Sequence, residues 1–274
     1  MVKLLRVVLF ETPHDPYMNL AFEEAFTRVR GAGLVDDTLR IWRNDKAVVI
    51  GYFQKAEDEI DMESASKLGV KVVRRFSGGG AVYHDLGNVN YALAVDGMAV
   101  PDPVDYVYTN LIRGALNALK LLGCEPYIEN VNDIVAGGRK VSGTAASFRW
   151  NVCFIHGTLL LNTDLTALSK VLKPPREKLL AKGVSEVKYR VTNLSELLGK
   201  KLSYKEVIEA LVRGFEETLG AETYFDMPSS EELNVARLLY EQKYSNPHWN
   251  LNRVPHSVFQ KIEEELQSFL SSKA

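Results

Sequence analysis

Residues Arg74–Tyr91, RRFSGGGAVYHDLGNVNY, combine two arginines with three consecutive glycines. A valine-rich strand leads into two arginines, a serine and three consecutive glycines. Glycine lets the backbone approach a ligand closely and adopt positive φ, so several N–H groups can face one anion. Arginine beside such a loop is a planar cation suited to phosphate. The segment is neither a GxGxxG nor a Walker loop, and a bare glycine triplet is also common in turns between strands.

The composition describes an ordinary globular chain. It has 274 residues, of which 46% are hydrophobic and 25% charged, with a formal net charge of -2. This charge gives no general attraction for nucleic acid, so none is expected as a partner. The N-terminus lacks the features of a signal peptide, and no run approaches the roughly 18 apolar residues of a membrane span. The two cysteines, Cys124 and Cys153, have no CxxC spacing, and we expect a reducing cytoplasm and no membrane partner.

Hydrophobic periodicity predicts a mixed order of strands and helices rather than a regular βαβ repeat. Thr38–Trp42 and Ala47–Phe53 read as a hairpin around the turn-like Asn44-Asp45. Other expected strands are Val2–Phe10, Val70–Phe76, Asn88–Val95 and Cys153–Leu161; expected helices are Pro16–Gly31, Ile60–Leu68, Val104–Leu122, Tyr204–Leu219 and Ser257–Leu270. This order predicts an α+β fold, with helices flanking a mixed, mostly antiparallel sheet, and one domain over residues 1–274.

Three further segments carry candidate chemistry. Asn132-Asp133 is followed by Gly138–Ala146, GRKVSGTAA, in which Lys140 lies between turns permitted by glycine and can reach an anion. His156 begins HGTLLLN within an apolar strand, where a histidine is more often packed than catalytic. Basic residues are dense over Lys173–Arg190, which is usual for a solvated loop but would also suit a nucleotide or an acidic partner protein.

Taken together, these segments resemble the lipoate–protein ligase A family, within the biotin/lipoate ligase superfamily. RRFSGGGAVYHDLGN, NDI…GRKVSGTA, HGTLLLNTDL and KGVSEVKYRVTNL occur in that family's order and approximate spacing. MNLAFEEA and WRNDKAVVIGYFQ also match, so the resemblance covers about residues 5–200 and, more weakly, KYSNPHWN near the C-terminus. It implies a biotin/lipoate ligase-like fold, related to that of class II aminoacyl-tRNA and biotin synthetases.

The resemblance also implies a two-step reaction. Lipoate attacks the α-phosphate of ATP, bound with Mg²⁺, to form lipoyl-AMP and pyrophosphate. A specific lysine on an acceptor lipoyl domain, in an E2 subunit of a 2-oxoacid dehydrogenase or in the glycine-cleavage H protein, then attacks the adenylate. The family assigns the catalytic role to Lys140, which touches both the acyl carbonyl and the phosphate.

The remaining site residues come from the same resemblance. With Lys140, those implied for ATP or lipoyl-AMP are Arg75, Ser77, Gly80, Ala81, Val82, Tyr83, Asn132 and Asp133. Those implied for the lipoyl chain are Gly78, Gly79, His84, Lys140, Ser142, Thr144 and His156. Asp133 is also the implied neighbour of Mg²⁺.

The chain departs from the bacterial type of this family in two respects. The accessory C-terminal domain of that type is expected to be absent, and the resemblance to short archaeal members implies a separate small subunit for adenylation. Tyr189 stands where the family usually has serine before Arg-Val-Thr-Asn, which places that serine's contact in question.

Three alternative functions stay open from the sequence. An octanoyltransferase or lipoyl-amidotransferase would use a cysteine thioester, but Cys124 follows a helix and Cys153 lies in an apolar strand. A biotin ligase would carry a GRGRxGRxW-like loop, which this sequence lacks. A non-catalytic subunit that holds an acyl-adenylate or a lipoyl domain is the third alternative.

Overall fold

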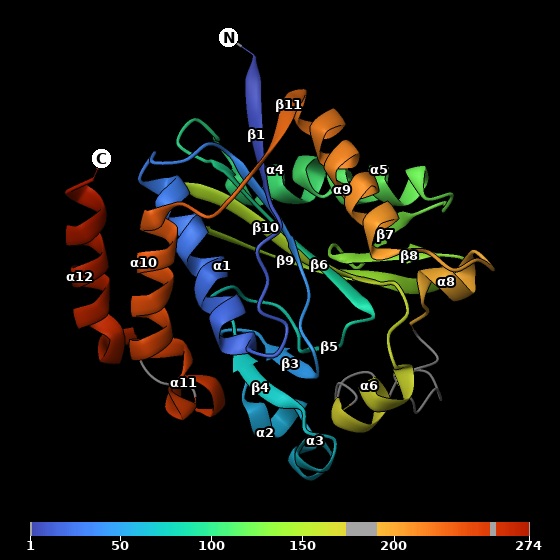
Figure 1. Ribbon diagram of the computed structural model, residues 1–274. Coiled ribbons are helices and arrows are strands. Elements are labelled where there is room, and N and C mark those ends of the chain that lie inside the picture. The colour runs from blue at the N-terminus through green and yellow to red at the C-terminus, as the bar shows by residue number, and fades with distance from the viewer. Residues whose placement is uncertain (1, 174–190, 253–255, 274) are drawn as a thin grey trace.

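The computed structural model describes residues 2–173, 191–252 and 256–273 (Figure 1). The strands are β1 Lys3–Val8, β2 Thr38–Trp42, β3 Ala47–Ile50, β4 Lys71–Arg74, β5 Val82–His84, β6 Asn88–Asp96, β7 Tyr127–Glu129, β8 Asp133–Ala136, β9 Arg139–Arg149, β10 Val152–Leu160 and β11 Ala221–Asp226. The α-helices are α1 Pro16–Gly31, α2 Ala56–Glu59, α3 Met62–Lys67, α4 Pro103–Tyr106, α5 Arg113–Leu121, α6 Leu165–Val171, α8 Leu194–Leu197, α9 Tyr204–Leu219, α10 Ser230–Leu239, α11 Pro247–Leu251 and α12 Gln260–Ser271. Tighter or wider helical turns are η1 Val107–Leu111, η3 Tyr240–Tyr244 and η4 His256–Phe259.

Two sheets organise these elements. The larger has eight strands in the order β11-β1-β2-β6-β10-β9-β8-β7, and the smaller has the order β4-β3-β5. Only the β11-β1, β1-β2 and β3-β4 pairs are parallel among the described strands. The predicted α+β class, with a mostly antiparallel sheet and flanking helices, is confirmed.

Helices cover both faces of the large sheet because its strands alternate two apolar sets. On one face, Leu93 and Ile155 pack with Phe215 of α9 and residues of α5. On the other, Ala94 and Phe154 pack with α1, α10 and α12. The small sheet forms a third core with α2, α3 and α6 (Figure 1). Among the described residues, no helix has the length and apolarity needed to cross a bilayer.

The predicted hairpin between Thr38–Trp42 and Ala47–Phe53 is wrong. β2 pairs with β1 and β6 in the large sheet, whereas β3 pairs with β4 and β5 in the small one. Asn44 between them is fully buried and hydrogen-bonds to distant side chains, so it anchors a crossover rather than an exposed turn.

One predicted helix is shorter than expected, and another contains a wider turn. The segment Ile60–Leu68 is helical only in α3, because Ile60 is extended and forms a bridge with Leu172 while Asp61 caps the helix by accepting from the N–H of Ser64. Val104–Leu122 is one helical rod, with the wider turn η1 between α4 and α5. Apart from Lys173, the basic run Lys173–Arg190 lies outside the described residues.

Candidate functional site

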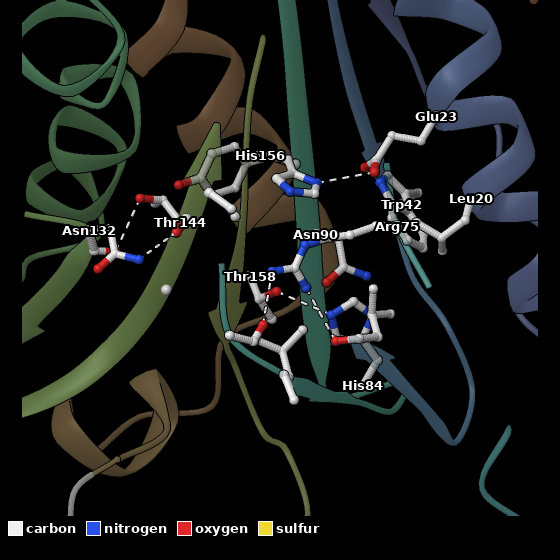
Figure 2. A pocket seen from close by; sticks show the side chains of 18 of the residues that line it. Leu20, Glu23, Trp42, Arg75, His84, Asn90, Asn132, Thr144, His156 and Thr158 are labelled. Carbon is white, nitrogen blue, oxygen red and sulfur yellow. Dashed lines mark hydrogen bonds and ion pairs between the residues drawn. The ribbon is translucent and has the colours of Figure 1, made fainter. Parts of the chain in front are cut away.

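A pocket lies where the small sheet and the glycine loop meet the middle of the large sheet (Figure 2). Its wall brings together predicted residues from segments far apart in the chain: Arg75, Gly80, Ala81, Val82, His84, Asn132, Lys140, Thr144 and His156. The other lining residues are Leu20, Glu23, Trp42, Val49, Asn90, Tyr91, Gly143, Ala145, Gly157 and Thr158. The predicted segments therefore converge on one cavity.

The side chain of Arg75 hydrogen-bonds to the backbone of the glycine loop. Its guanidinium donates to the carbonyls of Val49, Gly78 and Gly80, at 2.6 to 3.2 Å, and to the hydroxyl of Ser77. Burial lowers the pKa of Arg75 to about 10, although the nearby charge of Glu23 opposes that effect. In this structure the arginine holds the loop backbone in place, and at the same time it lines the pocket.

Arg74 holds the neighbouring segment Gly51–Gln54. It donates to the carbonyls of Gly51, Tyr52, Gln54 and Trp249, at 2.6 to 3.0 Å. The indole of Trp249 donates back to the carbonyl of Arg74. The match near the C-terminus, KYSNPHWN, thus helps to hold the Gly51–Gln54 segment, where the N–H of Tyr52 donates to the carbonyl of Ser77 at 2.8 Å.

Glycine is required at Gly79 in the glycine loop and at Gly51, which packs against that loop. Gly79 has φ 88°, and a Cβ there would lie 2.8 Å from Nη2 of Arg75. A Cβ on Gly51 would lie 2.1 Å from the carbonyl oxygen of Gly79, which no rearrangement of a flexible side chain can relieve. Gly79 and Gly80 are exposed, and Gly80 also lines the pocket.

Lys140 is on β9 and lines the pocket. Its Nζ lies 2.5 Å from Oδ1 of Asp133 and close to where a Cβ on Gly143 would be. The Lys140 side chain is one-third exposed, at 34%, and lines the pocket, so a ligand can reach it. On the backbone, the N–H of Thr192 donates to the carbonyl of Lys140, which joins the VTN segment to the same strand.

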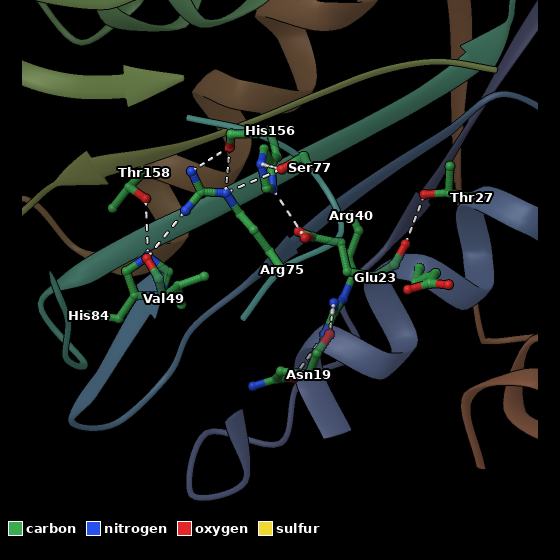
Figure 3. Close-up of polar contacts among 12 residues, drawn as sticks. Asn19, Glu23, Thr27, Arg40, Val49, Arg75, Ser77, His84, His156 and Thr158 are labelled. Carbon is green, nitrogen blue, oxygen red and sulfur yellow. Dashed lines mark hydrogen bonds and ion pairs between the residues drawn. The ribbon is translucent and has the colours of Figure 1, made fainter. Parts of the chain in front are cut away.

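His156 is fixed by a buried carboxylate. Its Nδ1 lies 3.1 Å from Oε2 of Glu23 on α1, and its Nε2 lies 2.7 Å from the hydroxyl of Ser77 (Figure 3). Glu23 is fully buried. Ser77 is buried behind the lining residues and also accepts from Arg75, so this chain of contacts positions His156 rather than exposing a nucleophile.

His84 belongs to a second series of buried hydrogen bonds, which determines which of its ring nitrogens carries the proton. Asn19 uses Oδ1 to accept from Arg40, so its Nδ2 donates to Oδ1 of Asn44, and the Nδ2 of Asn44 then faces Nδ1 of His84. His84 Nε2–H is left to donate to the hydroxyl of Thr158. Burial lowers the pKa of His84 to about 3, with a smaller effect of Arg75, so the ring stays neutral.

Asn132 is tied to Thr144 across the β8–β9 pair. Asn132 Nδ2 donates to the carbonyl of Thr144 at 2.9 Å, and the Thr144 hydroxyl donates to the carbonyl of Asn132 at 3.0 Å. Lys140 and Thr144 thus come from one strand, β9, although the flanking glycines predict turns on either side of Lys140.

Other predicted site residues do not line the cavity. These are Ser77, Gly78, Gly79, Tyr83, Asp133 and Ser142. Ser77 and Asp133 each contact a lining residue, whereas Tyr83 is packed in the core of the small sheet and Ser142 is buried opposite Leu159. Their roles in binding stay predictions.

Glu23, Trp42 and Asn90 line the pocket but were not singled out from the sequence. Glu23 lies in MNLAFEEA and Trp42 in WRNDKAVVIGYFQ, so the family resemblance of these two segments could have indicated both residues. Asn90 lies within an alternating strand pattern that gave no signal.

Neither cysteine belongs to the pocket. Cys124 and Cys153 are free thiols and both are buried. Burial raises the pKa of Cys153 to about 11, an effect that Asp96 and Asp37 strengthen, so the nucleophilic thiolate is disfavoured. The expectation of buried structural thiols is confirmed.

The described residues contain no cluster of three or more potential metal ligands. Asp133, the implied Mg²⁺ neighbour, already pairs with Lys140. One engaged carboxylate does not make a protein-built metal site.

Comparison with known proteins gives the family. Residues 15–216 match the model of the lipoyl protein ligase A/B catalytic domain. The chain is also 36% identical over 265 residues to lipoate-protein ligase A subunit 1 of Thermoplasma acidophilum, covering 92% of this chain and 98% of that protein.

Two solved structures agree with this comparison. One, described as a bi-partite lipoate protein ligase and its E2 lipoyl domain from Thermoplasma acidophilum, has a TM-score of 0.82 at 34% identity, covering 92% of this chain and 98% of the other. The other, a lipoate-protein ligase A bound with ATP, has a TM-score of 0.80 at 34% identity, covering 93% and 100%.

Proposed function

Since the chain belongs to the lipoyl protein ligase A/B catalytic domain family, we propose that it is a lipoate–protein ligase. It activates lipoate with ATP and transfers the lipoyl group to a lysine of acceptor lipoyl domains. The named relatives support ATP as a substrate and a lipoyl domain as the acceptor, since one is bound with ATP and another is described with an E2 lipoyl domain.

The position of Lys140 is the observation that carries this proposal. A carboxylate and an α-phosphate brought within about 4 Å repel each other by on the order of 4 kcal/mol at an effective dielectric near 20. A single ammonium in the pocket offsets that repulsion and follows the charge that develops on phosphorus. When the two anions enter, Lys140 exchanges its pairing with Asp133 for contact with both of them.

The first step forms one bond and breaks one. An oxygen of the lipoate carboxylate attacks the α-phosphorus, and the bond from that phosphorus to the pyrophosphate oxygen breaks. No general base is needed, because the carboxylate is already a nucleophile. The exposed backbone of Gly79 and Gly80 can face the phosphate.

The second step transfers the acyl group. The neutral ε-amine of the acceptor lysine attacks the acyl carbonyl, the new C–N bond forms, and AMP leaves with the electron pair of the mixed anhydride. The nitrogen then gives up its extra proton. Lys140 stays beside the departing phosphate throughout and stabilises the charge on it.

We propose Mg²⁺ as the companion of ATP, with ligands drawn mainly from the phosphates. Asp133 is the carboxylate expected beside it, once Lys140 has turned to the substrates. Arg75 supports the nucleotide by holding the loop rather than by binding the phosphate directly, because its N–H groups already donate to backbone carbonyls.

The subunit arrangement and the location are part of the same proposal. The relative named subunit 1 and the bi-partite system support a separate small subunit that assists adenylation. An H protein is the second expected acceptor. Two free cysteines are consistent with a reducing cytoplasm as the place of action.

The test measures each step separately. Lipoate-dependent exchange between ATP and pyrophosphate is assayed with and without a candidate small subunit, and transfer from synthetic lipoyl-AMP to an apo lipoyl domain is assayed with the chain alone. We expect transfer by the chain alone and exchange in at least one condition. Absence of both activities refutes the proposed function.

A further inference from the structure

Asn90 is an unusual residue for the wall of this pocket. It is 2% exposed, and neither its amide oxygen nor its amide nitrogen has a hydrogen-bond partner among the described residues. Figure 2 shows its side chain among those that line the cavity. The indole N–H of neighbouring Trp42 is likewise without a partner there. The amide nitrogen of Asn90 and the indole nitrogen of Trp42 are therefore two unpaired donors in the wall of the pocket.

The strand register shows which part this is. Gly143, Thr158, Asn90 and Trp42 form one row across β9, β10, β6 and β2. Residues paired in register project to the same face, and neighbouring strands are about 4.8 Å apart. The Nζ of Lys140 lies over Gly143, at the start of the row. Asn90 is two strands further on, about 10 Å along the row from Gly143.

That separation corresponds to the length of an extended eight-carbon acid. An acid with its carboxyl group at Lys140 and its chain along the row ends beside Asn90 and Trp42. Lipoate ends in a dithiolane ring, whose sulfurs are weak hydrogen-bond acceptors. Octanoate ends in a methyl group, which accepts nothing.

On the basis of the proposed function, we propose that Asn90 is a specificity-determining residue that favours the dithiolane end of lipoate over the methyl end of octanoate. Leaving a buried amide unpaired is costly, so an end group that accepts from Nδ2–H is preferred to one that cannot. The N–H of Trp42 adds a second donor to the same end. The oxygen of Asn90 is unpaired with either acid, so it does not contribute to the difference.

The experiment compares the kcat/KM of lipoate with that of octanoate in the ligation to a lipoyl domain. We expect the wild-type protein to prefer lipoate. In Asn90→Leu, which keeps the size of the side chain but removes its donors, the ratio should fall about tenfold. Asn90→Val, whose branched side chain suits a strand, is the second replacement if the leucine variant does not fold.

Thr158→Val is the matched control, because Thr158 occupies the same row beside Gly143, at the carboxyl end shared by both acids. It should change both kcat/KM values in the same proportion and leave the ratio unaltered. If Asn90 had a purely structural role, its variants would also change both kcat/KM values in the same proportion. An unchanged ratio in folded Asn90 variants, or a wild-type protein that does not prefer lipoate, overturns the inference, whereas loss of ligation with both acids in the wild type overturns the proposed function itself.

Discussion

Val131 lies in a strained backbone turn beside the pocket. Its φ is 73°, and the N–H of Asn132 donates to the carbonyl of Asn130 at 2.9 Å, so Val131 is the central residue of a positive-φ γ-turn. Such a conformation is costly for a β-branched residue. The turn sets the direction of Asn132, which the two hydrogen bonds with Thr144 then hold.

Replacing Val131 by glycine should therefore stabilise the fold. Glycine adopts positive φ without strain, and relief of roughly 1–3 kcal/mol exceeds the entropy cost of about 0.5–1 kcal/mol. The free energy of unfolding in urea should rise by about 1 kcal/mol. Val104→Gly is the matched control, since Val104 is equally exposed, at 64%, but lies in a helix, where glycine should destabilise. A decrease in the stability of Val131→Gly contradicts the strain argument.

Predictability at the residue scale depends on whether a partner lies nearby in the sequence. Lys140 was identified because its flanking glycines belong to a motif. The contacts of Arg75 were not foreseen, since arginine beside glycines suggests phosphate, while its acceptors here include the carbonyl of Val49 on another strand. Asn90 could not be found at all, because an unpaired amide is a property of the folded surroundings and not of the strand pattern.

Among the elements, α1 connects the site to the C-terminal helices. One of its residues, Glu23, supports His156 in the pocket, and the next, Glu24, accepts from Arg28, Lys243 and Tyr244 at 2.7 to 3.0 Å. Burial alone would raise the pKa of Glu24, but the charges of Lys243 and Arg28 outweigh it and lower the pKa to about 2.

This pKa predicts how stability depends on pH. A carboxyl group titrating near 2 in the folded state and near 4.5 when unfolded contributes about 3 kcal/mol above the unfolded value. That contribution is lost as the pH falls from about 4.5 to about 2. Glu24→Gln should thus be about 3 kcal/mol less stable at pH 7, with a difference that shrinks in acid.

Urea unfolding of the wild type and the variant from pH 7 to pH 3 measures this difference. Glu63→Gln is the control, because Glu63 forms a pair with Lys67 that is 78% exposed on the carboxylate side and should contribute little. A stability difference for Glu24→Gln that stays constant across this pH range contradicts the assignment.

Most elements could be predicted because their signals are local. Asp15-Pro16 marks the start of α1 and its side chain does accept from the N–H groups of Tyr17 and Met18. The pairing of strands was less predictable. Asn44-Asp45 looks like a turn, yet the burial of Asn44 between Asn19 and His84 sends the two flanking strands into different sheets.

In the whole molecule, the pocket exists because two sheets meet. The small sheet carries the glycine loop, and the large sheet carries Lys140, Thr158 and His156. Both cysteines lie away from this junction, in the core on the opposite face of the large sheet. A route through a cysteine thioester therefore has no nucleophile at the acyl pocket.

Changing Cys124 and Cys153 to serine should leave acyl transfer intact. The buried hydroxyls should lower stability by about 1–3 kcal/mol each, which melting curves will show. The rate of transfer from lipoyl-AMP, measured below the melting temperature, should match that of the wild type. Loss of transfer in the folded double variant would favour the thioester route.

In the proposed function, Lys140 brings the carboxylate and the α-phosphate together in the pocket. Lipoate-dependent ATP–pyrophosphate exchange by Lys140→Ala tests it most directly, with the small subunit present and Lys67→Ala as an exposed lysine control. Loss of about 4 kcal/mol of charge compensation predicts a fall of about a thousandfold, with an unchanged melting temperature and normal exchange in the control. Near-normal exchange by folded Lys140→Ala would show that Lys140 does not have this role.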